Sequence, residues 1–131
     1  MKNIKLAYLL PLLISTFSNA QEKMNSGCNK YIIMSAKADF DDDKKNDALV
    51  LYLQGGIVAV IKEPDHDFEK LYKIKYRDLG CVVPSDLELQ RYKSYNQFVF
   101  MYLKERFGDE WQQTVNQNTI GWNAPATLSN K

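Results

Sequence analysis

The chain has 131 residues, of which 45% are hydrophobic and 25% charged, with 17 basic against 16 acidic side chains. This near balance argues against nucleic acid or an anionic membrane surface as a partner. The length predicts one domain of ordinary size, whose core is sufficient without being large.

The first twenty residues have the pattern of a secretory signal. Lys2 and Lys5 precede an apolar stretch, Leu6–Ile14, and Ser18-Asn19-Ala20 is a small-residue cleavage site. The apolar stretch is too short to span a bilayer, so we expect residues 1–20 to be removed rather than to anchor the chain. The sequence therefore predicts a single domain over residues 21–131, periplasmic or secreted, with no membrane span.

Cys28 and Cys81 are the only two cysteines. An exported chain enters an oxidising compartment, so we expect them to form one disulfide, and the alternative is two free or metal-binding thiols. Closing a loop of roughly fifty residues stabilises a domain by about 3–4 kcal/mol in the chain-entropy model.

Four segments in the first half of the domain have the composition of strands. Tyr31–Ala38 is rich in β-branched and aromatic residues, and Leu71–Arg77 alternates apolar with basic residues. Ala48–Gln54 and Ile57–Lys62 are apolar runs separated by Gly55-Gly56, which is typical of a two-residue hairpin turn. The sequence therefore predicts an antiparallel meander with this hairpin at its centre.

The sequence of the second half of the domain decides less clearly between helix and strand. Ser85–Glu88 has the S-x-x-E form of a helix capping box, whereas the aromatic and β-branched content of Tyr95–Phe107 favours a strand, so residues 85–107 stay open between helix and strand. Asp109–Asn116 fits a short helix, and the polar segment from about residue 117 suggests a loosely ordered tail. The expected fold class is a single β-rich α+β domain with an antiparallel sheet and a short C-terminal helix.

An acidic segment lies between the first two expected strands. Residues 39–47 hold five aspartates in nine positions. In a turning loop such carboxylates converge on one point, and their spacing suits Ca²⁺. The expected ligands are the side chains of Asp39, Asp41, Asp43 and Asp47 and the carbonyl of Lys45. The alternative is a solvated turn in which these residues bond their own backbone.

The pattern D-x-D-x-D-x-x-x-D, followed by a strand, resembles the calcium loops of FG-GAP and VCBS-type repeats over residues 39–54. The resemblance implies the same five ligand positions and assigns Phe40 to the aromatic commonly found between the first two acids. It does not extend to the rest of the chain, and one such unit cannot build a propeller. Lys44 replaces the usual glycine and Val50 occupies the twelfth position, so we expect an affinity of only ~10⁻⁴ to 10⁻³ M and a bracing role for the ion.

His66, between Asp65 and Asp67, is the only histidine. We expect an exposed turn residue, and the alternative is a periplasmic hydrolase that uses His66 or the acidic-loop carboxylates. The chain has no nucleophile-elbow, zinc-protease or phosphate-loop motif, so it is predicted not to be an enzyme.

Eight Tyr, six Phe and two Trp make an aromatic-rich chain. Tyrosine and tryptophan anchor protein interfaces, although aromatic residues also simply pack on a sheet. Those near lysines and arginines are the expected partner-binding residues: Tyr72, Tyr76, Tyr92, Tyr95, Trp111 and Trp122. The predicted function is a small exported protein-binding module, in its concrete version an inhibitor or immunity protein against a cell-envelope toxin or hydrolase.

Overall fold

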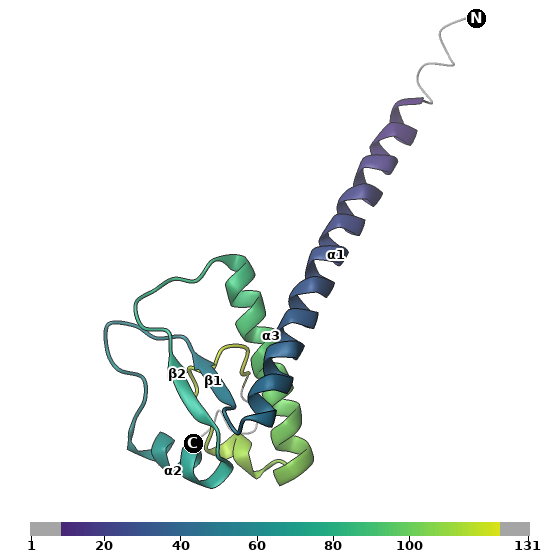
Figure 1. The fold of residues 1–131 in the computed structure, drawn as a ribbon. Coiled ribbons are helices and arrows are strands. Elements are labelled where there is room, and N and C mark those ends of the chain that lie inside the picture. The colour runs from purple at the N-terminus through teal and green to yellow at the C-terminus, as the bar shows by residue number, and fades with distance from the viewer. Residues whose placement is uncertain (1–8, 124–131) are drawn as a thin grey trace, which may run out of the picture. The chain divides into compact units, whose positions relative to one another are not determined.

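The computed structural model describes the backbone of residues 9–123 and the side chains of residues 27–123. The chain forms two units, Met1–Tyr31 and Ile32–Lys131, each of which is described by itself. The elements are labelled in Figure 1 and are, in chain order, α1 (Leu9–Lys45), β1 (Val50–Leu53), α2 (Glu63–Tyr72), β2 (Lys75–Asp78), α3 (Asp86–Phe107) and the 3₁₀ helix η1 (Glu110–Gln113).

In the first unit the described residues, 9–31, all belong to α1. Side chains 27–31 are exposed. The expected cleavage site at residues 18–20 is helical here, and residues 1–8 lie outside the described part. The signal sequence and its cleavage stay predictions.

The second unit begins with the last turns of α1, where the sequence predicted a strand and then a loop. Both predictions are wrong, because Ile32, Ala36 and Phe40 are buried at a spacing of four, which is the period of a helix and not of a strand. The helix ends after Lys45, where the N–H of Ala48 donates to the carbonyl of Asp43 over 2.9 Å. Asp47 provides the left-handed residue that such an ending needs, with φ 52°.

The expected β-rich antiparallel fold is also wrong. The described residues are mostly helical, and their one sheet has two parallel strands, β1 and β2, with Leu51 opposite Tyr76. Parallel neighbours need a crossover, and α2 provides it. Figure 1 shows β1 and β2 side by side.

The hairpin at Gly55-Gly56 does not form, because both edges of β1 are already occupied. β2 lies on one edge, and on the other the N–H of Gln54 donates to the carbonyl of Asn118 and the N–H of Ile120 donates to the carbonyl of Tyr52, each over 2.9 Å. Ile57–Lys62 has no free edge of β1 to pair with, and it is not a strand. Part of the segment expected to be a loose tail thus lies along β1.

The alternation over residues 71–77 predicts burial correctly but the element incorrectly. Tyr72, Ile74 and Tyr76 are buried while Lys73 and Lys75 are exposed. Only Lys75–Asp78 forms a strand, because α2 extends to Tyr72.

Helix α3 begins where the capping box predicts. The Ser85 hydroxyl accepts from the N–H of Glu88, and a Glu88 carboxylate oxygen accepts from the N–H of Ser85 over 2.8 Å. The strand favoured over Tyr95–Phe107 is wrong, since Tyr95, Val99 and Leu103 are buried at a spacing of four. The short helix expected after it is the 3₁₀ helix η1.

The core of the second unit is rich in aromatic pairs. Phe68 contacts Tyr76 at a centroid distance of 5.1 Å, and Phe100 stacks on Trp111 at 5.5 Å. The first pair joins α2 to β2, and the second joins α3 to η1.

Candidate functional site

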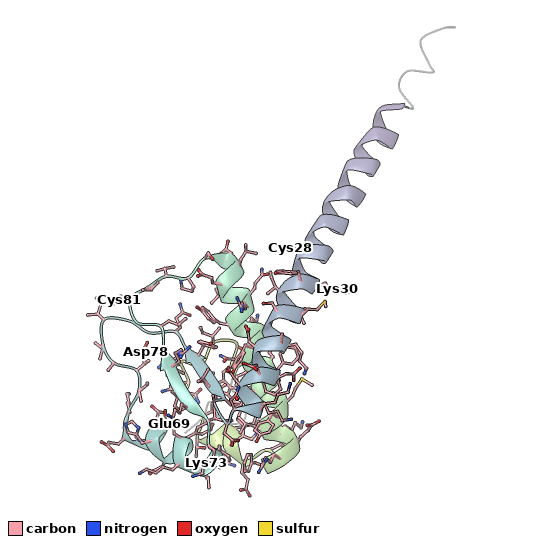
Figure 2. The ribbon with its side chains drawn as sticks, viewed as in Figure 1. Cys28, Lys30, Glu69, Lys73, Asp78 and Cys81 are labelled. Atoms are coloured by element: carbon pink, nitrogen blue, oxygen red, sulfur yellow. The ribbon has the colours of Figure 1, made fainter. Side chains whose placement is uncertain are left out.

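Two loops follow the carboxyl ends of the parallel strands: residues 54–62 after β1 and residues 79–85 after β2. Figure 1 shows both leaving the same end of the sheet, and Figure 2 labels Cys81 on the second loop. The loops touch, because the thiol of Cys81 donates to the carbonyl of Gly56 over 3.4 Å. In open α/β sheets this end of the strands is where ligands usually bind.

Four aliphatic side chains on these loops are turned to solvent: Ile57, Val58, Val82 and Val83 are exposed by 97%, 77%, 74% and 90% respectively. We call them the apolar loop pair. Residues 54–61 and 79–84 contain no charged residue. A concentration of uncharged, exposed aliphatic residues marks an interaction surface.

Glycines bring the two loops together. A Cβ at Gly55 would lie 1.9 Å from Asp78 Oδ1 and 2.6 Å from the backbone N of Gly80, so only glycine fits there. Gly80 has φ +64° and donates its N–H to Asp78 Oδ1 over 2.8 Å. Gly55, the first residue of the pair that predicted a hairpin, therefore has a different role, which is close approach between the loops.

A buried carboxylate fixes the far end of the first loop. Asp65 is 5% exposed and accepts from the N–H of Lys62 over 2.7 Å and from the side-chain amide of Asn116 over 2.8 Å. The same amide donates to the carbonyl of Val60 over 2.8 Å. Local sequence patterns could not predict this role for Asp65, because Asn116 is far along the chain.

A second feature is a hollow of about 1020 Å³, which we call the α2 hollow; it lies beside the outer face of α2, the turn at residues 47–50 and the exposed residues of β2. Its cations are Lys70, Lys73, Lys75 and Arg77, and its carboxylates are Asp47, Glu63 and Glu69. His66 also lines it, with Nδ1 3.3 Å from Glu69 Oε2. Glu69 Oε1 accepts from the N–H of Tyr76 over 2.8 Å.

The expected calcium ligands do not share a loop. Asp39, Asp41, Asp43 and Lys45 lie on the last turns of α1, and Asp47 follows in the turn.

Most of these carboxylates have partners. Asp39 pairs with Arg91, whose Nε lies 3.0 Å from Asp39 Oδ2, and this bond raises the pKa of the Arg91 guanidinium. Asp41 pairs with Lys37, and Asp43 accepts from the Tyr95 hydroxyl over 2.6 Å. In the part of the chain that the structure describes, no group of three or more histidine, cysteine or acidic side chains is arranged to hold a metal ion. Calcium binding stays a prediction.

The aromatic residues expected to bind a partner are mostly in the core. Tyr72, Tyr76, Tyr95 and Trp111 are buried, whereas Tyr92 and Trp122 are half-buried. Burial raises the pKa values of the Tyr76 and Tyr95 hydroxyls, as expected for side chains removed from water. A partner role for these six residues stays a prediction, and the surface that sequence reasoning missed is the apolar loop pair. Its signal was present as two uncharged runs, residues 54–61 with the Gly55-Gly56 pair and residues 79–84 ending at Pro84.

Both cysteines are free and exposed, Cys28 in the first unit and Cys81 in the second. The disulfide between them stays a prediction. Within residues 9–123, no helix is both long and apolar enough to cross a membrane.

Comparison with known proteins adds no relative. No family model, no curated protein and no solved structure matches the chain. The fold and its surfaces therefore carry the functional argument: a small, mostly helical α/β unit with exposed apolar loops at the carboxyl ends of its strands.

Proposed function

We propose that this chain is a small exported, non-catalytic protein-binding module, and that the apolar loop pair contacts the partner. The observation that supports this function is the full exposure of Ile57 and Val83 on loops that contact each other. Burying a valine or isoleucine side chain against a partner contributes about 1.5–3 kcal/mol. Burial of four such side chains would offset part of the entropy that association costs.

Contacts at both ends of the first loop also favour binding. Gly55 approaches the backbone of Gly80, and Asp65 holds the end of the first loop through Lys62. A surface that is ordered before binding loses less conformational entropy in the complex. The partner is expected to offer an apolar surface, because residues 54–61 and 79–84 offer no charge to pair with.

The concrete version of this function is an inhibitor or immunity protein that blocks a toxin or hydrolase of the cell envelope. It depends on export by residues 1–20, and it rests on analogy with other small exported domains. Identifying the partner tests both the export of the chain and its role as an inhibitor or immunity protein.

Position-specific cross-linking tests the proposal. A photo-reactive amino acid in place of Ile57 is expected to yield one discrete adduct with a different protein in cells that make the chain. The same residue in place of Lys104, an exposed side chain on α3, serves as the control. Adding Val83→Glu to the probe chain should weaken the adduct by about tenfold, because it places a charge in the apolar contact.

Val83→Glu should leave the fold intact, since a side chain 90% exposed contributes little to stability and its substitution changes the free energy of unfolding by about 0.5 kcal/mol or less. Equal cross-linking from position 104, or an adduct indifferent to Val83→Glu, would contradict the proposal. An adduct of twice the chain mass would identify a self-association surface instead.

The alternative function is a periplasmic hydrolase with His66 as general base. The contact of Glu69 with His66 in the α2 hollow favours it, because a carboxylate can orient an imidazole for proton transfer. This alternative predicts that the chain hydrolyses simple ester or phosphate substrates and that His66→Gln abolishes the activity. Activity equal in the variant would eliminate it.

A further inference from the structure

The α2 hollow contains more cationic side chains than its carboxylates neutralise. Lys75 and Arg77 alternate with buried Tyr76 and so share one face of β2. The Arg77 guanidinium lies 5.9 Å from the centre of the Tyr52 ring, and Lys70 lies 4.0 Å from Asp67. Among the described residues, Lys73 and Lys75 have no carboxylate within ion-pair distance.

The carboxylate of the hollow that is nearest to these lysines in the chain, Glu69, is already bonded. Glu69 accepts from the N–H of Tyr76 over 2.8 Å with one oxygen, and its other oxygen lies 3.3 Å from His66 Nδ1. Figure 2 labels Glu69 and Lys73 on this side of the unit. Both carboxylate oxygens of Glu69 therefore have partners, the backbone of β2 and the His66 imidazole.

Lys73 has a backbone conformation that glycine would adopt at lower cost. It ends α2 with φ 58°, in the left-handed region, and its N–H donates to the carbonyl of Glu69 over 3.0 Å. A residue with a Cβ costs about 1 kcal/mol more than glycine at such a position. The chain thus has a lysine that lines the hollow at a position where glycine would have a lower backbone energy. Backbone strain of this kind is associated with functional sites.

We propose that the α2 hollow binds an oxyanion, a carboxylate or phosphate group, through the ammonium groups of Lys73 and Lys75. The two cations supply the charge, and His66, held by Glu69, adds a polar ring in the same hollow. This site lies beside α2 and the start of β2, so it is distinct from the apolar loop pair at the carboxyl ends of the strands.

Titration of the full chain with inorganic phosphate and with succinate, at ionic strength held constant with sodium chloride, tests the site. Amide NMR signals of residues 73 and 75 are expected to shift and to saturate with the probe. Saturation by phosphate alone assigns the site to phosphate groups, saturation by succinate alone to carboxylates, and saturation by both to either source.

Lys73→Gly and Lys75→Gln should each weaken binding by about fivefold, the loss of one exposed charge interaction. Lys73→Gly also relieves the left-handed strain and is expected to fold at least as stably, so lost binding is not lost folding. Lys104→Gln, on α3, is the matched control and should bind as the unchanged chain does. Shifts that follow sodium chloride alone, or unchanged affinity in both Lys73→Gly and Lys75→Gln, would overturn the proposal.

Discussion

The carboxamide of Asn96 takes the place of a neighbouring strand along part of β1. Its oxygen accepts from the N–H of Tyr52 over 3.0 Å, and its nitrogen donates to the carbonyls of Tyr52 and Ile120, each over 2.9 Å. Asn96 is fully buried, so no water can replace these bonds. One side chain of α3 thereby pairs with the N–H and the carbonyl of Tyr52 in β1. It also attaches the segment around Ile120 to β1.

Replacing Asn96→Leu should therefore destabilise the second unit strongly. The change removes the Asn96 partner of the Tyr52 N–H and of the Ile120 carbonyl, each at a cost of about 1–3 kcal/mol, while the Tyr52 carbonyl keeps the N–H of Ile120. We therefore expect a loss of about 3 kcal/mol or more. Urea denaturation followed by circular dichroism measures it. Gln97→Ala, on the exposed side of the same helix, should change stability by about 0.5 kcal/mol or less. A loss below about 1 kcal/mol in Asn96→Leu would show that these bonds contribute little.

The buried hydroxyl of Tyr95 is expected to make the stability of the fold depend on pH in the alkaline range. Burial raises the pKa of its hydroxyl from 10.0, and donation to Asp43 over 2.6 Å raises it further. Because the folded pKa lies above the unfolded one, the stability is fully present below about pH 10 and is lost as pH rises above it. Tyr76 acts in the same direction.

The melting temperature should fall between about pH 9 and 11, and Tyr95→Phe should reduce that fall. At neutral pH the same variant should be less stable by about 1 kcal/mol, since it loses one hydrogen bond. Tyr31→Phe, at an exposed position, should keep the full pH dependence. Parallel curves for the unchanged chain and Tyr95→Phe would contradict this account.

At the scale of elements, the sequence predicted what depends on neighbours along the chain. The Ser85–Glu88 capping box, the existence of β1 and the inward side of residues 72–76 all follow from local patterns. Residues 31–38 and 98–103 have the composition of strands, yet their buried residues recur every four positions because they pack as helices. Composition is a weaker determinant than the face that tertiary packing buries.

The strand pairing and the candidate surfaces could not be predicted in this way. The partner of β1 depends on which segments reach its edges, and β2 and residues 118–120 are far from it in sequence. Once those edges are filled, residues 57–59 remain in solvent instead of in a sheet, while Val60 and Ile61 pack partly against the core. A residue pattern typical of a buried strand thus became an exposed surface for a non-local reason.

At the scale of the whole molecule, the division into two units makes a prediction about folding. All the residues of the main hydrophobic core, from Ala36 to Val115, belong to the second unit. A domain folds by itself when it contains its own core. Residues 32–131 should therefore unfold cooperatively, with a free energy of unfolding within about 0.5 kcal/mol of the reduced full chain.

Urea denaturation of the fragment and of the full chain in reducing agent makes this comparison in the absence of a disulfide. Cys28 lies in the first unit and Cys81 in the second, so a disulfide would add its stabilisation only to the oxidised full chain, and the fragment cannot form it. A stability gain on oxidation, absent from the fragment, would support the bridge, whose chain-entropy contribution is about 3–4 kcal/mol. A fragment that fails to fold, or that loses more than about 2 kcal/mol against the reduced chain, would show that residues before Ile32 contribute to the fold, because exposed positions rarely contribute so much.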